Sequence, residues 1–304
     1  MKSHAGCIAG QVNDPVQGVA VPLRWLYPST TTTRPERFGP YELSVALNGA
    51  VEGDQLALVV ISHGGGGSSL THRGLALSLA QCGFVVALLE HPGNNRADNS
   101  LEGTLANLEN RPRHLSLAID ASFAHPLIGP ALAPDKVAVI GHSMGGYTAL
   151  AAAGGRPLWR QDGTGQAEVR QVAVSADPRI GALVLLAPAC GWFAYPGGLA
   201  EVDLPIMLRT AEKDALAAQL HAHIVQHDER DPRKVDAGVV ANAGHHAFQS
   251  PFPASMTRAD FAPSQDPAGF DRIAYLHGMN EEICQFLAKT MSGTVKPATP
   301  SNIV

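Results

Sequence analysis

The chain has 304 residues, of which 45% are hydrophobic and 16% are charged, and its net charge is −5. This composition excludes a disordered chain, a coiled coil and a highly charged tail protein, and without a basic block we expect no nucleic-acid partner. The longest apolar runs are far below the roughly 18 residues that cross a bilayer, so we expect no membrane span.

The cysteines and the first residues bear on cellular location. The segment Met1–Cys7 contains no long apolar stretch, so we expect no secretory signal. Cys7, Cys82, Cys190 and Cys284 lie far apart without a CxxC pair, a pattern typical of reduced, mostly buried thiols. We therefore expect a cytoplasmic protein. With no repeat or linker, we predict one domain over residues 1–304, with a flexible tail from about 292.

The first elements predicted along the chain are antiparallel strands. Apolar residues alternate from Val19 to Tyr27, where Pro22 favours an edge position in the sheet. They alternate again over Tyr41–Leu47, which the turn pair Asn48-Gly49 follows.

From residue 56 the pattern changes to short, continuous apolar runs separated by helical segments. The runs predicted as strands are Leu56–Ile61, Phe84–Leu89, Val137–Ile140, Leu183–Leu186, Ile206–Leu208 and Val235–Val240. Helices are expected before Cys82, at Leu115–Phe123, Tyr147–Ala153 and Ala215–His227, and from Ile273 to Leu287. This alternation predicts a mixed, mostly parallel sheet covered by helices on both faces. In such sheets the ligand binds at the carboxyl ends of the strands.

A motif of the G-x-S-x-G type follows the strand Val137–Ile140. It reads Gly141-His142-Ser143-Met144-Gly145 and stands between a predicted strand and a predicted helix. The glycines remove side chains that would collide at a sharp turn, and the following helix N-terminus favours negative charge nearby. We predict that Ser143 is a nucleophile. The alternative is a small-residue turn that packs a helix onto the sheet.

A glycine-rich loop, Gly64–Gly67, follows the strand Leu56–Ile61. Its backbone N–H groups could face a developing oxyanion, with Gly64 or Gly65 the first candidates and the N–H of Met144 the second donor. A phosphate-binding loop is the alternative, but such a loop ends in a lysine that is missing here.

An acid and a base are sought after the last two strands. Asp214 follows Ile206–Leu208 and is the candidate for orienting the base, with Glu212 as its rival. His245 follows Val235–Val240 and is the candidate base, with His246 as its competitor. Ser143, Asp214 and His245 stand in the chain order expected of this architecture.

Other side chains near these loops are candidates for lining the substrate pocket. They are His63, His142, Trp192, Phe193, Tyr195, His246 and Phe248. We expect His142 to point away from Ser143. His223 and His227 have a spacing that can bind zinc, but no HExxH glutamate lies between them, so we predict no metal and no cofactor.

Several segments, taken in order, carry a family resemblance. They are Arg37–Leu43, Ile61–Gly64, Gly83–Ala87 with His91–Asn95, Asn110–Pro112, Gly141–Tyr147, Ala243–His245 and Gly269–Arg272. Together they resemble α/β-hydrolases of the dienelactone hydrolase-like, platelet-activating factor acetylhydrolase-like group. The resemblance implies the α/β-hydrolase fold, with a mostly parallel, eight-stranded-type sheet. It also implies Ser143 as nucleophile, Asp214 as acid and His245 as base. Classical dienelactone hydrolases have a cysteine where this chain has Ser143.

The function expected from these features is that of a serine hydrolase acting on a small or medium carboxylic ester through an acyl-enzyme. An amidase or lactonase with the same triad is an alternative, because the motif does not distinguish leaving groups. A non-catalytic receptor for a small molecule is the alternative from another class. A homodimer is compatible with the sequence.

Overall fold

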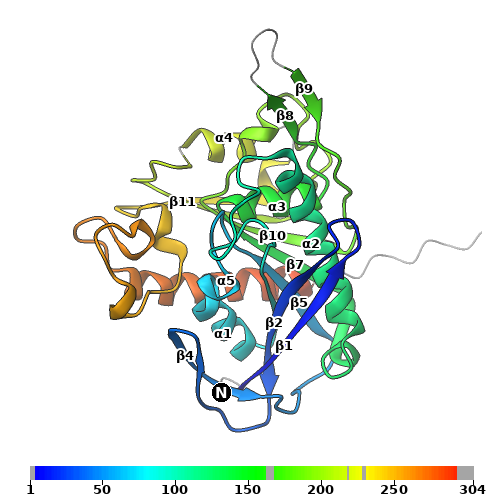
Figure 1. Ribbon diagram of the computed structural model, residues 1–304, viewed down its shortest axis with the longest axis vertical. Coiled ribbons are helices and arrows are strands. Elements are labelled where there is room, and N and C mark those ends of the chain that lie inside the picture. The colour runs from blue at the N-terminus through cyan, green and yellow to red at the C-terminus, as the bar shows by residue number, and fades with distance from the viewer. Residues whose placement is uncertain (1–3, 162–167, 218, 228–230, 293–304) are drawn as a thin grey trace, which may run out of the picture.

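The fold was derived from a computed structural model, which describes residues 4–161, 168–217, 219–227 and 231–292. The tail predicted from about residue 292 lies outside the described residues. Figure 1 shows a central twisted sheet with helices packed against it, and a small hairpin that projects from the body.

The sheet has ten strands among the described residues, in the order β12-β11-β10-β7-β5-β6-β2-β1-β4-β3. Their bounds are β1 (His4–Asp14), β2 (Val19–Ser29), β3 (Arg34–Phe38), β4 (Tyr41–Leu47), β5 (Leu56–Ser62), β6 (Val85–Leu89), β7 (Leu132–His142), β10 (Ile180–Leu186), β11 (Ile206–Ala211) and β12 (Val235–Val240). The six strands from β12 to β6 are all parallel, and β6 pairs antiparallel with β2. The mostly parallel sheet is confirmed, with ten strands in place of the eight expected. The projecting hairpin is β8 (Leu158–Gln161) and β9 (Glu168–Gln171).

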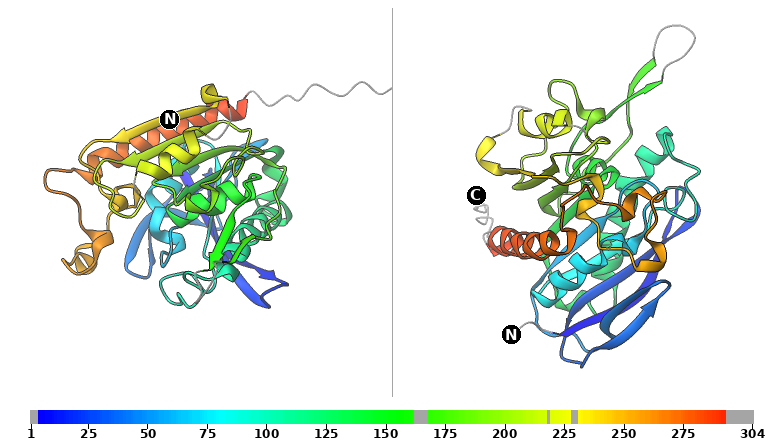
Figure 2. Two further views of the ribbon diagram at one scale, coloured as in Figure 1. Left: turned by 90° about the horizontal axis from the view of Figure 1, so that it is seen from above. Right: turned by 90° about the vertical axis from the view of Figure 1, so that its left-hand side faces the viewer.

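Helices cover both faces of the sheet, as predicted. Their bounds are α1 (Arg73–Gln81), α2 (Leu105–Ala124), α3 (Met144–Ala152), α4 (Gln219–His227) and α5 (Arg272–Ser292). Residues of α2 and α3 belong to one hydrophobic core, and residues of α1 and α5 belong to the core on the opposite face. Figure 2 shows α5 lying along the sheet on its own side.

The alternation of side chains between these two cores explains the continuous apolar runs. In β5, Leu58 and Val60 face one core while Val59 and Ile61 face the other, and all four are buried. A strand buried on both faces needs apolar residues at every position. Burying each such side chain stabilises the fold by roughly 1.5–3 kcal/mol.

Two expectations about the antiparallel side need correction. Strand β1 was not expected from the sequence, because its alanines and glycines show no apolar alternation. The edge position inferred from Pro22 is wrong, since β2 lies between β1 and β6. Pro22 stands just outside the β2–β6 register and offers only its carbonyl, which accepts a hydrogen bond from the Glu90 N–H at 3.0 Å. The missing N–H of proline therefore disrupts no pairing with β6.

A proline inside α2 is accommodated by the neighbouring helix. Pro112 cannot donate a hydrogen bond to the carbonyl of Leu108, one turn earlier. The Tyr147 hydroxyl of α3 donates to that carbonyl instead, at 3.0 Å. The side chains of Pro112 and Tyr147 are both buried, so this hydrogen bond fixes α2 against α3.

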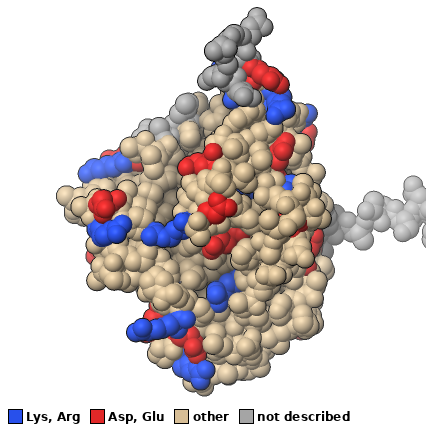
Figure 3. Space-filling model, in the orientation of Figure 1, with Lys and Arg blue, Asp and Glu red and all other residues tan. Residues whose placement is uncertain are grey.

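No described helix combines the length and apolar character that crossing a bilayer requires. All four cysteines lie among the described residues and none forms a disulfide: Cys7 and Cys190 are buried, Cys284 is partly buried, and Cys82 is exposed. The face in Figure 3 carries scattered charges of both signs and no basic patch.

Two helical glycines provide a matched test of packing. A Cβ on Gly145 would overlap the backbone carbonyl of Ser62, whereas a Cβ on Gly278 would meet nothing within 4 Å. We expect Gly145→Ala to lower the free energy of unfolding by about 1–3 kcal/mol or more, and Gly278→Ala to raise it by about 0.5–1 kcal/mol. Urea unfolding measures both, and equal shifts would contradict the packing described.

Candidate active site

Ser143 occupies the turn between β7 and α3 with a strained backbone. Its φ is 54° and its ψ is −118°, a conformation that side-chain-bearing residues rarely adopt. Three hydrogen bonds hold it there: the Ser143 N–H donates to the Leu186 carbonyl at 3.0 Å, and the Ser143 carbonyl accepts from Ala189 and Gly146 at 2.9 and 2.8 Å. The turn therefore presents the hydroxyl at the carboxyl edge of the sheet.

Glycines on either side make this turn possible. A Cβ on Gly141 would overlap Gly145, and a Cβ on Gly146 would overlap Pro188. A Cβ on Gly64 would lie 3.2 Å from the Cβ of Ser143. The glycine-rich loop after β5 thus lies directly against Ser143.

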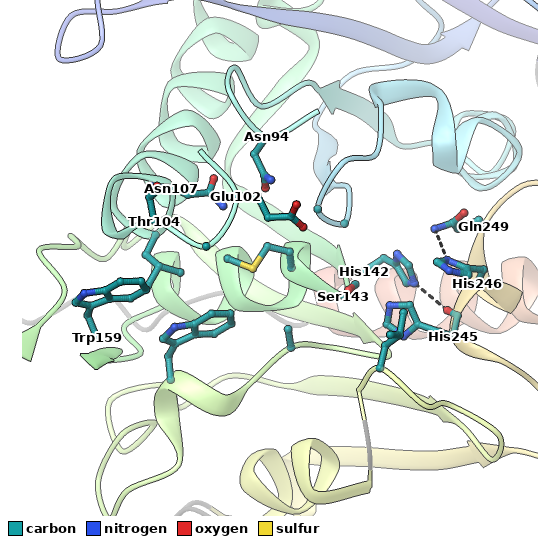
Figure 4. A pocket seen from close by; sticks show the side chains of 18 residues that line it. Asn94, Glu102, Thr104, Asn107, His142, Ser143, Trp159, His245, His246 and Gln249 are labelled. Atoms are coloured by element: carbon teal, nitrogen blue, oxygen red, sulfur yellow. Dashed lines mark hydrogen bonds between the residues drawn. The ribbon is translucent and has the colours of Figure 1, made fainter. Parts of the chain in front are cut away.

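His245 and Asp214 form a buried pair beside this turn. His245 Nδ1 lies 2.7 Å from Asp214 Oδ2, and because a carboxylate only accepts, Nδ1 carries the proton. The other oxygen, Oδ1, accepts the N–H groups of Leu216 and Ala217, both at 2.8 Å. Burial raises the pKa of Asp214, but these hydrogen bonds outweigh it and hold the pKa below its ordinary value. Asp214 thus engages only Nδ1, and the imidazole of His245 lines the same pocket as Ser143 (Figure 4).

Neither rival residue takes part in this hydrogen-bonded pair. The Glu212 carboxylate accepts the backbone N–H of Asn242 at 2.6 Å and is exposed. His246 contacts Gln249 at 3.2 Å, and burial, followed by the charge of His245, lowers its pKa to about 4. Of the four candidates, the structure brings together Asp214 and His245.

His63 orients the glycine-rich loop. The backbone N–H of His91 donates to His63 Nε2 at 3.2 Å, so the proton is on Nδ1, which donates to the Gly64 carbonyl at 2.7 Å. Gly67 donates to the same carbonyl at 3.2 Å. In a trans peptide the N–H points opposite to the carbonyl. The Gly65 N–H therefore points away from the His63 imidazole, and Gly65 is among the residues that line the pocket.

Arg111 of α2 binds the peptide group between His63 and Gly64, at the start of the glycine-rich loop. Its fully buried guanidinium donates to the His63 carbonyl, to Asn94 Oδ1 at 2.6 Å and to Thr148 Oγ1 at 2.9 Å. None of these acceptors is a carboxylate, and burial lowers the Arg111 pKa to about 9. A buried cation thus lies directly behind the loop that faces Ser143.

His142 lines the pocket next to Ser143 and contacts His245. Its Nε2 donates to the His245 carbonyl at 3.0 Å, and the two rings lie 5.0 Å apart. Burial, followed by the charge of His245, lowers the His142 pKa well below its ordinary value, so this imidazole is neutral. Its position fixes the backbone that carries His245.

A cavity of about 340 Å³ lies beside the turn at Ser143. Ser143, Met144, Gly64, Gly65, His142, His245, His246 and Trp192 line it, as do residues that the sequence analysis missed: Asn94, Glu102, Thr104, Asn107, Leu108, Trp159, Leu216 and Gln249. Asn94 could have been found, because it follows the carboxyl end of β6. Trp159 has no such signal, since its hairpin is separate from the main sheet.

Four predicted pocket residues do not line this cavity. Phe193 is buried and stacks on Tyr147, with ring centroids 5.6 Å apart. Phe248 is buried behind His142, and His63 is buried beneath the loop that it orients. Tyr195 lines a neighbouring cavity, where its hydroxyl donates to the Arg156 carbonyl.

Within the described part of the chain, no three His, Cys, Asp or Glu side chains are grouped to hold a metal ion. The side chain of His227, one of the two histidines with zinc-binding spacing, lies outside that part.

Buried neutral histidines make stability depend on pH. Burial lowers the pKa of His63 to about 3 and of His72 and His114 to about 4, with Arg111 adding to the effect at His63. These pKa values lie below the ordinary value of about 6.5. At pH values between the folded and the unfolded pKa, the unfolded chain therefore binds more protons than the folded chain. Stability is therefore fully present above about pH 6.5 and falls as the pH drops.

We expect the free energy of unfolding to fall below pH 6.5 by up to about 1.4 kcal/mol per pH unit for each such histidine. Urea unfolding between pH 7.5 and pH 5 (about the range of the ordinary histidine titration) measures this. Replacing the exposed His277 by Gln should leave the slope unchanged, whereas His114→Gln should reduce it. A stability independent of pH over this range would refute the neutral, buried state.

Comparison with known proteins places the chain in a family. Residues 53–244, well over half of the chain, match the hydrolase family described as serine aminopeptidase, S33. No curated protein matches the sequence.

Two solved structures share the fold at low sequence identity. A ferulic acid esterase from Streptomyces cinnamoneus is similar at a TM-score of 0.67 and 16% identity, over 98% of this chain and 93% of that one. A dienelactone hydrolase from Anabaena variabilis is similar at a TM-score of 0.56 and 16% identity, over 93% of this chain and 98% of that one. The resemblance to dienelactone hydrolase-like α/β-hydrolases is confirmed at the level of the fold. The chain belongs to the serine aminopeptidase S33 family of α/β-hydrolases and is a serine hydrolase.

Proposed function

We propose that the protein hydrolyses a small or medium carboxylic ester through a Ser143-His245-Asp214 triad and an acyl-enzyme. The observation that carries the proposal is the strained turn at Ser143, which opens into the same pocket as His245, while the far nitrogen of that imidazole is bound to Asp214. Nucleophile, base and orienting acid are the three parts that such chemistry requires.

The steps follow from the protonation states. His245 Nε2 takes the proton of Ser143 as its oxygen attacks the ester carbonyl, and Asp214 stabilises the imidazolium that forms. His245 then gives this proton to the leaving alcohol, which departs and leaves an acyl-serine. Water loses a proton to His245 and attacks the acyl group, and Ser143 recovers its proton as the acid leaves.

The tetrahedral oxyanion would bind two backbone N–H groups. Met144 is the first residue of α3, so its N–H has no partner within the helix. We choose Gly65 for the other N–H, because this N–H points away from the Gly64 carbonyl that His63 binds and Gly65 lines the pocket. Of the two glycines considered from the sequence, Gly65 is therefore our choice.

The pocket supports a substrate of modest size. A volume of about 340 Å³ suits a small or medium acyl group, and Leu108, Trp159 and Trp192 offer apolar contact. The similar fold of a ferulic acid esterase makes esters of aromatic acids one part of the substrate screen.

A fluorophosphonate probe followed by intact-mass and peptide analysis tests the nucleophile. One adduct on Ser143, absent in Ser143→Ala, is expected, with p-nitrophenyl ester turnover lowered by about 10⁶-fold in that variant. No adduct would favour a non-catalytic receptor. Faster turnover of matched anilides or lactones would identify an amidase or lactonase.

Two substitutions test whether Asp214 or the nearby Glu212 is the acid that orients His245. Asp214→Asn should lower kcat by about 10⁴-fold, because the amide no longer holds His245 in the tautomer with a free Nε2. Glu212→Gln is the matched control and should leave kcat within about threefold, since ordinary surface changes are near neutral. Kinetics on one p-nitrophenyl ester suffice, and the reverse ranking would move the role to Glu212.

Arg111 is predicted to act as a positioning residue. Arg111→Met frees the His63 carbonyl and loosens the loop, so kcat should fall by about 10–100-fold with KM little changed, less than the loss of a whole oxyanion donor. Thr148→Val removes another acceptor of Arg111 but leaves the loop contact, and should have a much smaller effect on kcat. Equal losses in both variants, or a change confined to KM, would reject the positioning role.

A further inference from the structure

We propose that the acyl part of the substrate carries a cationic nitrogen, which binds the Glu102 carboxylate beside the Gly64–Gly65 loop. The inference rests on the ester hydrolysis proposed above and specifies its substrate class. It begins from Glu102, a carboxylate in the pocket that the acyl-transfer steps do not use.

A chain of hydrogen bonds fixes this carboxylate. Arg111 only donates, so Asn94 turns Oδ1 towards it and donates through Nδ2 to Asn99 Oδ1 at 2.7 Å. Asn99 then donates through Nδ2 to Glu102 Oε2, also at 2.7 Å. Each amide orientation follows from the one before it, so the chain of hydrogen bonds links the buried guanidinium to Oε2 of Glu102, an exposed residue.

The other oxygen of Glu102 faces the loop. Oε1 lies 4.0 Å from the point that a Cβ of Gly65 would occupy, and no described residue donates a hydrogen bond to it. A carboxylate here repels the developing oxyanion, which by itself slows acyl transfer. A cation on the substrate removes this repulsion, so the arrangement favours substrates that carry one.

The position in the pocket identifies which part of the substrate bears the charge. His245 must reach the leaving alcohol to protonate it, so the alcohol lies on the His245 side. The acyl group extends to the opposite side, where Figure 4 shows Glu102 and, further along, Trp159.

The rest of this side suits a cation. No Lys or Arg is among the described residues that line the pocket, so nothing there neutralises Glu102 directly. Indole rings attract ammonium groups through their faces, and Trp159 and Trp192 both line the cavity. An acyl chain ending in a carboxylate would meet repulsion instead.

The test compares three p-nitrophenyl esters of similar length. One carries γ-trimethylammoniobutyrate, the second is its neutral isostere with carbon in place of nitrogen, and the third is the half-ester of glutaric acid. We expect kcat/KM to be about five- to tenfold higher for the cationic ester than for the neutral one, as a partly exposed ion pair with aromatic contact allows. The glutarate ester should be the slowest.

Two variants and a control locate the effect. Glu102→Gln should abolish the preference for the cationic ester over the neutral one, and Asn99→Ala should weaken this preference by releasing the carboxylate. Glu52→Gln removes an exposed acid outside the pocket and should retain the full preference. Added salt should reduce the preference in the wild-type protein.

The outcomes separate this inference from the proposed function. Equal rates for the cationic and neutral esters, or a preference that survives Glu102→Gln, would overturn the cationic substrate while leaving ester hydrolysis intact. No hydrolysis of any ester together with no fluorophosphonate adduct on Ser143 would overturn both.

Discussion

The strained backbone of Ser143 is the constraint on which the site depends. A residue held at this φ and ψ costs about 1–3 kcal/mol, and it persists because the surrounding structure admits nothing else. The turn lies between a strand buried on both faces and a helix whose residues are buried on nearly every side. Close approach of β5, α3 and the loop after β10 requires glycine at positions 141, 145 and 146. The packing of the sheet thus determines where one hydroxyl points.

The second feature is a polar network behind the glycine-rich loop Gly64–Gly67. Arg111 reaches the backbone of His63, the hydroxyl of Ser62 at 3.3 Å and the amide of Asn94. From Ser62 the hydrogen bonds continue to His91 at 2.9 Å and from there to His114 at 3.2 Å. Burying a cation without a carboxylate partner is unfavourable. The neighbours of Arg111 are polar groups with fixed directions, and in the proposed mechanism its positive charge would stabilise the oxyanion that forms during the reaction. We infer that the network lowers the stability of the fold but fixes the geometry of the loop.

The pocket has two functionally different halves. On one side, neutral imidazoles and backbone groups surround His245, and His142 links the His245 backbone to the turn at Ser143. On the other side, the side-chain amides of Asn94 and Asn99 form the hydrogen bonds that link Arg111 to Glu102. A general esterase needs only the first half. The second half carries the cation binding that we propose for the acyl group.

Local physics explains which parts of this arrangement were predictable. The buried strands appear as apolar runs because both of their faces are covered, and the turn at Ser143 appears as glycines because only glycine fits there. The choice of Gly65 over Gly64 was not predictable, since it depends on a hydrogen bond from His63 to a carbonyl. Phe193 and Phe248 have the right location along the chain but are buried by the core. Trp159 reaches the pocket from a hairpin with no counterpart in the main sheet, so strand order alone does not place it.

The most direct test of the central claim is a crystal structure of the protein after reaction with a fluorophosphonate, which leaves a tetrahedral adduct resembling the intermediate. The account predicts phosphorus bonded to Ser143 Oγ, with one phosphoryl oxygen about 2.7–3.1 Å from the N–H groups of both Gly65 and Met144. An adduct on another residue, or a phosphoryl oxygen directed away from these two groups, would contradict it.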